Sequence, residues 1–187
     1  MKIFIDAISK LGQFTKDDLT TITQIATPKS VAPGDHLLEA GEVSSTLFFL
    51  QSGALLRSGR NEEGEFVVRD LFVGGDWVID HKSFTGRSPA VHSIKAHAAS
   101  QLLALEIEGL HELIAASPVF FQLGSILKMA TARQEFFDQY ESPEDRYRHI
   151  LAHRAELVQQ FPLKFIASYL RMTPETLSRV RKRISSK

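Results

Sequence analysis

Near the carboxyl end, three side chains have the types and the spacing needed to read the edges of DNA bases. Glu175 and Arg179 are four positions apart, so they share one face of a helix, and Ser178 lies beside Arg179. An arginine can donate two hydrogen bonds to guanine O6 and N7, and a glutamate can accept one from cytosine N4. The same spacing also suits an ordinary salt bridge on a solvated helix, which could coexist with base reading in the free protein. We predict that Glu175, Ser178 and Arg179 contact bases.

The positive charge of the chain is concentrated around these residues. The formal net charge is zero, but residues 161–187 carry seven Lys or Arg against one Glu, a net charge of +6, which residues 1–160 balance. An acidic body with a basic tail is typical of a protein that binds nucleic acid, because the cations neutralise phosphates. Phosphate contacts fix the position of a protein on DNA but do not read its sequence. We assign that role to Lys164, Thr173, Thr176, Arg181, Lys182 and Arg183.

A helix-turn-helix would present these side chains, since it places its second helix in the major groove. Thr173 can cap this recognition helix and Pro174 suits its first turn, so we expect it at residues 174–184. The turn before it often contains glycine, whereas this chain has Arg171, for which a positive φ costs on the order of 1 kcal/mol. The alternative is an ordinary helical hairpin with a solvated basic face. Six small or apolar residues predict the packed frame: Ile166, Ala167, Leu170, Met172, Leu177 and Val180.

The middle of the chain has the pattern of a β-structure. From about residue 29 to about residue 105, short apolar runs alternate with glycines, which predicts short strands joined by tight turns. Regular spacing of such runs is typical of an antiparallel barrel or a double-sheet roll. Helical patterns lie on both sides of it. We therefore predict an α+β protein whose N-terminal unit, residues 1–115, is an antiparallel β-roll or jelly roll flanked by helices.

A long helix is predicted next, at residues 116–141. Its apolar residues recur at intervals of three and four, a seam that is typical of helices that pair with a second copy. The seam could instead pack on the roll of its own chain. We assign five residues to a dimer contact: Phe120, Leu123, Leu127, Ala130 and Phe137. A hinge containing Pro143 follows, and residues 142–187 form the predicted helix-turn-helix domain.

Together, these features resemble the Crp–Fnr family of bacterial transcription regulators over nearly the whole chain. Residues 175–179, Glu-Thr-Leu-Ser-Arg, match the E-x-x-S-R recognition pattern of that family. The roll adds Gly41-Glu42, the run 47–50 before Gly53, and the G-D element at residues 75–78. The resemblance implies a cytoplasmic homodimer that grips two half-sites of double-stranded DNA and responds to an effector bound in the roll. It also makes RNA polymerase a candidate partner.

The effector pocket departs from the cyclic-nucleotide pattern of the family. Binders of cyclic nucleotides have G-E-L after the G-D element and a later R-S-A, whereas this chain has residues 79–81, Ile-Asp-His, and Ala90 at about the arginine position. Arg87 comes three residues too early. A phosphate without its guanidinium loses about 1.5–3 kcal/mol, so cyclic AMP is not expected, and the pocket holds another small ligand or none. The basic residues nearby would favour an anion. The candidate pocket residues are Trp77, Asp80, Lys82, Arg87, Ser88, Lys95 and Thr131.

Composition excludes several other classes. The chain has no cysteine, which rules out disulfides, thiolate metal sites and cysteine nucleophiles. The seven histidines show no metal-ligand spacing, and no nucleophile–base pair emerges, so we expect no cofactor, no metal and no enzyme activity. The N-terminus does not resemble a signal peptide, no apolar run could span a membrane, and only four residues follow Arg183, too few for a β-hairpin wing. The alternative function is a ligand-sensing roll whose tail binds a protein instead of DNA.

Overall fold

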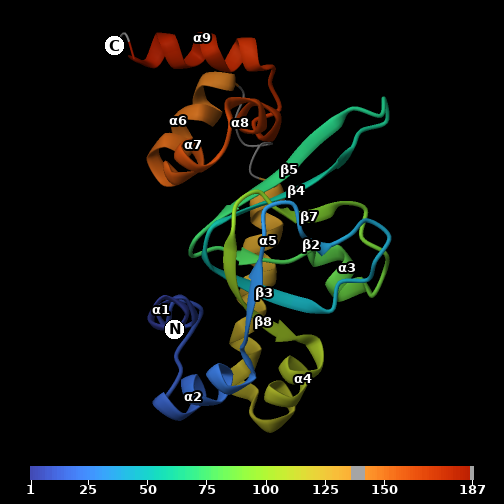
Figure 1. Cartoon of the computed structure of the whole chain (residues 1–187). Coiled ribbons are helices and arrows are strands. Elements are labelled where there is room, and N and C mark those ends of the chain that lie inside the picture. The colour runs from blue at the N-terminus through green and yellow to red at the C-terminus, as the bar shows by residue number, and fades with distance from the viewer. Residues whose placement is uncertain (136–141, 186–187) are drawn as a thin grey trace.

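The computed structural model describes residues 1–135 and 142–185 of the chain. Two short helices open it, eight strands form a roll, and further helices lead to a helical head at the carboxyl end (Figure 1). This arrangement confirms the predicted α+β class. The strands are β1 (Thr27–Val31), β2 (His36–Leu38), β3 (Thr46–Ser52), β4 (Ala54–Arg60), β5 (Phe66–Val73), β6 (Trp77–Val78), β7 (Ser93–Ala96) and β8 (Ser100–Glu106).

The roll consists of two four-stranded antiparallel sheets. Their strand orders are β1-β8-β3-β6 and β2-β7-β4-β5, and apolar side chains such as Leu50, Leu55 and Leu102 fill the space between them. Gly53 makes the tight turn from β3 to β4 at a φ of +102°, and a Cβ there would collide with Ser100 of β8. The glycines that mark the strands in the sequence therefore include one that the close approach of the two strands requires.

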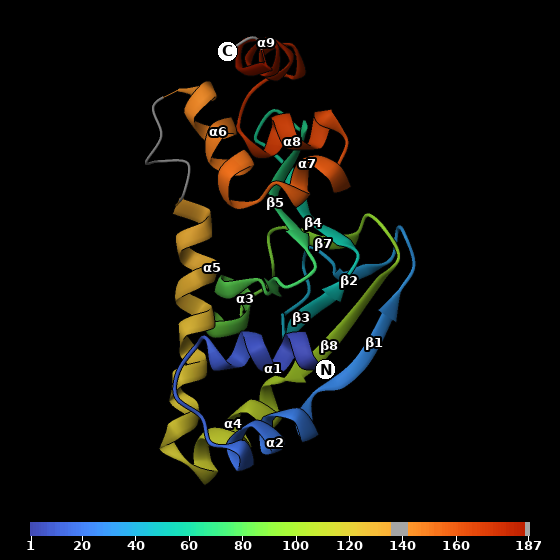
Figure 2. The ribbon, with the colours of Figure 1, turned by 90° about the vertical axis from the view of Figure 1, so that its left-hand side faces the viewer.

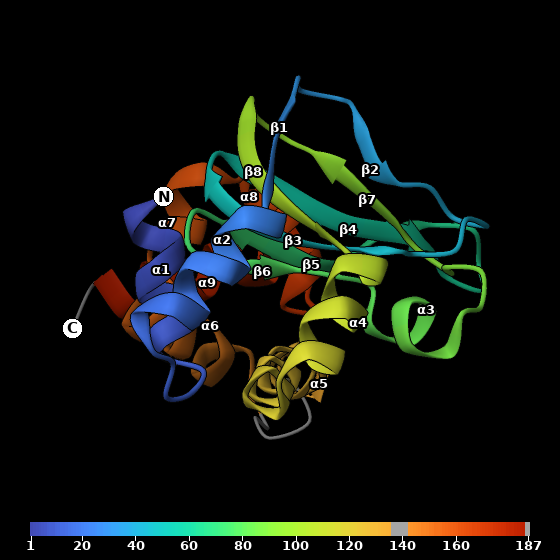
Figure 3. The ribbon, with the colours of Figure 1, turned by 90° about the horizontal axis from the view of Figure 1, so that it is seen from below.

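Helices cover the face of the first sheet that points away from the second (Figure 3). Phe4 of α1 inserts between the sheet and the helices, with its ring centroid 5.4 Å from that of Phe49 and 5.8 Å from that of Trp77. This cluster anchors the amino-terminal helices to β3 and β6. The helices are α1 (Lys2–Ser9), α2 (Lys16–Ile25), α3 (His81–Gly86), α4 (Ile107–Ala116) and α5 (Ser125–Glu135).

The predicted long helix differs from the prediction in two ways. Residues Pro118–Gly124 form a 3₁₀ helix, η1, and the α-helix begins only at Ser125. Phe120 and Leu123, predicted to contact a second copy, are buried in the core of their own chain, and Leu127 and Ala130 are half-buried against the same cluster. The assignment of Phe120 and Leu123 to a dimer contact is therefore wrong, because these side chains are already covered by their own chain. Phe137 lies outside the described residues.

Four helices form the head, which packs on the outer face of β4 and β5 (Figure 2). Val68 and Leu71 of β5 share one apolar cluster with Ile166 and Leu177 of the head. The Val68 N–H also donates to Ser168 Oγ at 2.9 Å. Among the described helices, none is long and apolar enough to cross a bilayer. The head helices are α6 (Pro143–His153), α7 (Glu156–Gln160), α8 (Leu163–Tyr169) and α9 (Pro174–Ser185).

Candidate nucleic-acid interface

The predicted helix-turn-helix corresponds to α8 and α9. Ala167 is fully buried where the two helices meet, and Leu177 and Val180 form the buried side of α9. The turn closes through hydrogen bonds from the Arg171 N–H to the Ser168 carbonyl and from the Met172 N–H to the Ala167 carbonyl, both at 3.0 Å. Arg171 has a φ of +55°, so the residue that replaces the usual glycine does adopt the left-handed conformation.

The start of α9 is capped as its sequence predicts. Thr173 Oγ1 accepts a hydrogen bond from the Thr176 N–H at 3.2 Å, and Pro174 is the first residue of the helix. Glu175 is fully exposed; hydrogen bonds from its own backbone and from the Thr173 side chain lower its pKa, and Arg179 adds a smaller effect. Glu175 therefore stays a carboxylate, the form that accepts a hydrogen bond from cytosine.

The outer face of α9 carries the residues predicted to read bases. Glu175, Ser178 and Arg179 are all exposed, and α9 lies at the end of the molecule farthest from α2 and α4 (Figure 1). Arg179 Nη2 contacts Thr176 Oγ1 at 3.3 Å, and among the described residues it forms no ion pair with Glu175. The surface salt bridge that competes with base reading is therefore not formed in this structure.

The residues predicted to bind phosphates are not all equivalent. Arg181 and Lys182 are exposed along α9, whereas Arg183 Nη1 lies 3.2 Å from Glu144 Oε2 at the start of α6. Lys164 lies on α8, with its ammonium 5.2 Å above the ring of Phe165. The pairing of Arg183 with α6 was not visible in the sequence, because 39 positions separate the two residues.

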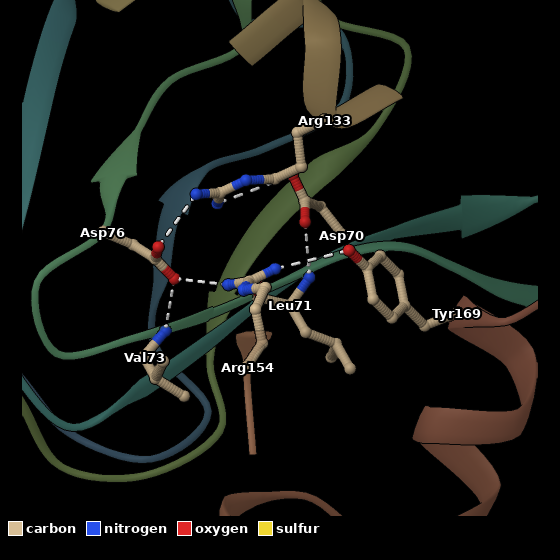
Figure 4. Close-up of polar contacts among 7 residues, drawn as sticks. All are labelled: Asp70, Leu71, Val73, Asp76, Arg133, Arg154 and Tyr169. Carbon is tan, nitrogen blue, oxygen red and sulfur yellow. Dashed lines mark hydrogen bonds and ion pairs between the residues drawn. The ribbon is translucent and has the colours of Figure 1, made fainter. Parts of the chain in front are cut away.

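A second group of polar residues joins the head to the rest of the chain (Figure 4). Asp76, in the turn before β6, accepts from Arg133 of α5 at 2.8 Å through Oδ1 and from Arg154 at 2.6 Å through Oδ2. Its Oδ2 also accepts from the Val73 N–H at 2.9 Å. Arg154, just after α6, donates further to the Leu71 carbonyl at 2.9 Å. A single carboxylate therefore links the roll, α5 and the head.

Two buried groups complete this network. Asp70 is buried, and burial raises its pKa against the opposing effect of Arg133, whose Nη1 is 4.0 Å from Asp70 Oδ2. Burial opposes the charge of Arg133, but Asp70 and Asp76 outweigh it and raise the pKa of that guanidinium. Burial, aided by Asp70, raises the pKa of Tyr169 to about 12, and the phenol oxygen lies 3.3 Å from Arg154 Nη1. We refer to Asp70, Asp76, Arg133, Arg154 and Tyr169 as the interdomain network.

A histidine also packs between the roll and the head. The ring of His97, which follows β7, stacks on Phe161 at a centroid distance of 5.1 Å and meets the edge of Phe165 at 5.5 Å. Burial lowers its pKa. Because the folded state disfavours the charged ring, His97 stabilises the fold above the ordinary histidine pKa of about 6.5, and this contribution is lost as the pH falls through the lowered pKa.

We predict that His97→Gln reduces the loss of stability on acidification. The free energy of unfolding, measured by urea denaturation, should fall less between pH 7.5 and pH 5 in the variant than in the wild type. His111→Gln, at an exposed position of α4, is the matched control and should leave the pH dependence unchanged. Equal pH dependence of His97→Gln and the wild type would contradict this role of the interface.

The predicted effector residues are not all brought together. Trp77 is buried in the aromatic cluster with Phe4 and Phe49. Thr131 Oγ1 donates a hydrogen bond to the Leu127 carbonyl at 3.0 Å. Arg87 donates to the Ser44 carbonyl at 2.9 Å and lines an apolar hollow beside α4. Lys95 is half-buried on β7, opposite His36 of β2.

Three of the predicted residues do share one cleft. Asp80, Lys82 and Ser88 line a cavity of about 670 Å³ together with residues of β4, β5 and the α8–α9 turn. Asp80 caps α3 by accepting from the Ser83 N–H at 3.0 Å. On the side of the roll that faces α5, by contrast, the cavity beside Trp77 and Arg133 measures only about 10 Å³. A third cavity, of about 270 Å³, is lined by residues of β2, β3 and the segment before α3. Of these three, the cavity of about 670 Å³ opens toward the head.

The comparisons with known proteins agree with this architecture. Residues 28–117 match the family model of the cyclic nucleotide-binding domain. No curated protein sequence matches the chain. FixK2 from Bradyrhizobium japonicum is a structural neighbour with a TM-score of 0.67 at 14% identity, covering 87% of this chain and 85% of its own.

Two further solved structures show the same relationship. The catabolite activator protein of Thermus thermophilus has a TM-score of 0.59 at 17% identity, covering 94% of this chain and 86% of its own. The c-di-GMP-responsive global regulator CLP of Xanthomonas campestris has a TM-score of 0.60 at 14% identity, covering 92% of each chain. By their descriptions, the Thermus thermophilus protein is an activator and CLP is a regulator of gene expression. Residues 28–117 are therefore similar to a cyclic nucleotide-binding domain, and the chain has the fold of these three solved structures.

Proposed function

We propose that this protein is a DNA-binding transcription regulator that reads a two-fold operator through α9. The observation that carries the proposal is the orientation of that helix. Leu177 and Val180 are buried on the side of α9 that packs against the rest of the head. The opposite side exposes Glu175, Ser178 and Arg179 to solvent. A helix held in this way can enter a major groove, and the surrounding cations can contact phosphates.

Selection of bound duplexes from a random pool tests this function. A transcription regulator of this type should enrich a two-fold site whose half-sites are about 34 Å apart. Binding of random duplex should weaken steeply as salt rises, because phosphate contacts release counterions. No enrichment, together with no salt-dependent binding of random duplex, would favour the alternative that the tail binds a protein.

We further propose that the protein acts as a homodimer through the side of η1 and α5 that its own core leaves open. Phe121 and Met129 are 66% and 49% exposed, and Lys128 is exposed between them. Leu127 and Thr131, both half-buried, border this face. Large apolar side chains that stay exposed in the single chain favour burial against a second copy.

Replacing both Phe121 and Met129 with glutamate should raise the dimer dissociation constant at least about tenfold, because central apolar contacts dominate such interfaces. Sedimentation velocity over a range of concentrations measures this change. Ile3→Glu, which changes an equally exposed apolar residue on α1, is the control and should leave the dissociation constant unaltered. A double variant that dimerises as well as the wild type would exclude this face.

The effector is proposed to be an anion other than cyclic AMP. Ala90 is buried at the position where cyclic-nucleotide binders have arginine, so the guanidinium that would hold a cyclic phosphate is absent there. The basic side chains of the cleft between the roll and the head are instead contributed by other elements. We therefore place the effector in this cleft rather than inside the roll.

A further inference from the structure

Two histidines lie side by side on α6, the first helix of the head. His149 and His153 are four positions apart, and their ring centroids are separated by 4.3 Å at an interplanar angle of 46°. Tyr147 and Ile150 form the buried side of the helix, whereas His149 is half-buried and His153 is exposed. The pair therefore lies on the flank of α6, at one side of the head, where both rings can be reached from solvent (Figure 2).

The spacing and the ring distance suit the chelation of one metal ion. Residues at positions i and i+4 of a helix share a face, so two imidazoles there can each direct a nitrogen at a common point. Zn²⁺ lies about 2.0–2.1 Å from each histidine nitrogen that binds it, so chelating rings have to be close neighbours. Imidazole suits Zn²⁺, Cu²⁺ and Ni²⁺, whereas Mg²⁺ and Ca²⁺ prefer oxygen ligands. The expectation that the histidines lack metal-ligand spacing is therefore revised for this pair.

The arginines of this segment are directed to other partners. Arg148 pairs with Glu144 at 2.7 Å, and Arg154 pairs with Asp76 at 2.6 Å. Arg146 donates to a carbonyl at the end of α8. In the first two cases a carboxylate offsets the positive charge. A divalent cation therefore meets less repulsion on this helix than its number of arginines suggests.

The pair would leave part of the coordination sphere of a metal ion open. Within residues 1–135 and 142–185, no group of three or more histidine, aspartate or glutamate side chains is placed to share one ion. Zn²⁺ takes four ligands in structural sites, so water or a ligand from outside would fill the remaining positions. A site with only two protein ligands responds to the metal concentration, because it lacks the closed ligand set that makes a structural ion a permanent part of a fold.

We propose that His149 and His153 bind a divalent transition-metal ion of the Zn²⁺ type as a two-residue chelate on the flank of α6. The site is independent of the proposed function, since neither ligand belongs to the residues assigned to DNA contact. An ion held by both rings ties together positions that are one helical turn apart. It stabilises the folded chain by mass action, because the unfolded chain does not hold the two rings together.

The chelate would also act on the contact between the head and the roll. His153 is the last residue of α6, and Arg154 follows it as the cap, with its N–H donating to the Ile150 carbonyl at 2.8 Å. The Arg154 side chain reaches Asp76 and the Leu71 carbonyl. A metal ion that fixes the last turn of α6 therefore holds in place the arginine that joins the head to the roll.

Isothermal titration calorimetry of the full chain with zinc chloride tests the site. The wild type should bind one Zn²⁺ per chain with an affinity that His149→Gln and His153→Gln each reduce about tenfold or more. This loss is expected because even a residue that only supports a metal ligand contributes about 10–100-fold to affinity. Saturating Zn²⁺ should raise the thermal midpoint of the wild type and of neither variant. Mg²⁺ should not compete, since the site offers no oxygen ligand.

Two controls separate chelation from general binding of zinc to histidines. His111→Gln removes an exposed ring of α4 and should keep the wild-type affinity. Leu151→His combined with His153→Gln keeps the number of histidines in α6 but places them two apart, where they do not face each other. This repositioned pair should bind as weakly as His153→Gln alone. Leu151 is 38% exposed, so a histidine fits there, and circular dichroism without metal checks the fold.

The proposal would be overturned by absence of Zn²⁺ binding to the wild type, by equal affinity of the wild type and either single variant, or by full affinity of the repositioned pair. None of these measurements contains DNA. Each of those outcomes therefore leaves the selection of an operator to decide the proposed function separately.

Discussion

Replacing Asp76 with asparagine should lower the free energy of unfolding by about 3–5 kcal/mol, because two largely buried guanidiniums would lose their shared carboxylate. The side chains of Asp76, Arg133 and Arg154 are 16%, 20% and 19% exposed, so water cannot replace the missing charge well. Asparagine preserves the size of the side chain and one acceptor oxygen. The loss therefore reports the charge rather than the packing.

Urea denaturation provides the measurement. Glu144→Gln is the comparison: Glu144 is itself 20% exposed, but its partners Arg148 and Arg183 are 44% and 64% exposed. Pairs whose cation is open to water contribute about 0–1 kcal/mol. A loss of less than about 1 kcal/mol in Asp76→Asn would show that the interdomain network does not stabilise the fold.

The same variant should show whether the head separates from the roll before the whole chain unfolds. Trp77 is the only tryptophan and lies in the core beneath the roll, so its fluorescence reports that part alone. Circular dichroism reports the helices, including the four of the head. If Asp76 mainly holds the head in place, the two transitions should coincide in the wild type and separate in Asp76→Asn.

Local patterns in the sequence predicted the parts of the fold that local chemistry determines. The spacing of Ile166, Leu170, Leu177 and Val180 specifies two packed helices regardless of what surrounds them. The glycines of the middle region mark turns because their positive φ values are a property of the backbone. The positive φ of Arg171 could be predicted for the same reason, because the turn of a helix-turn-helix often contains glycine at this position.

The interdomain network could not be predicted, because its members are distant in the sequence. Asp76 was noted only as part of the G-D element, and Arg133 and Arg154 lie 57 and 78 positions away from it. Nothing in the pattern around each arginine distinguishes it from a solvated surface charge. Only the docking of α6 and α5 on the roll brings the three side chains together.

Periodicity also does not say which surface covers an apolar stripe. Phe120 and Leu123 have the spacing of a dimer seam, but the core beneath the roll covers them. Phe121, between them in the 3₁₀ helix η1, is exposed instead.

Arg179→Ala should abolish the preference of the protein for its selected operator while leaving weak, salt-sensitive binding to any duplex. A bidentate arginine–guanine contact is worth about 1–3 kcal/mol of discrimination, which corresponds to a factor of roughly 5–150 in affinity between correct and wrong sites. Folding should be unaffected, since Arg179 is exposed and contacts only Thr176 Oγ1 within the described residues.

Arg181→Ala is the matched comparison, because it removes the same charge from the same exposed helix. A phosphate contact carries no sequence information, so this variant should weaken binding to operator and scrambled duplex equally and reduce the salt slope by about 1. Gel shifts of both duplexes at several salt concentrations separate the two outcomes. If Arg179→Ala kept the operator preference, or if Arg181→Ala lost it, α9 would lie in the groove in a different orientation from the one that Glu175, Ser178 and Arg179 define.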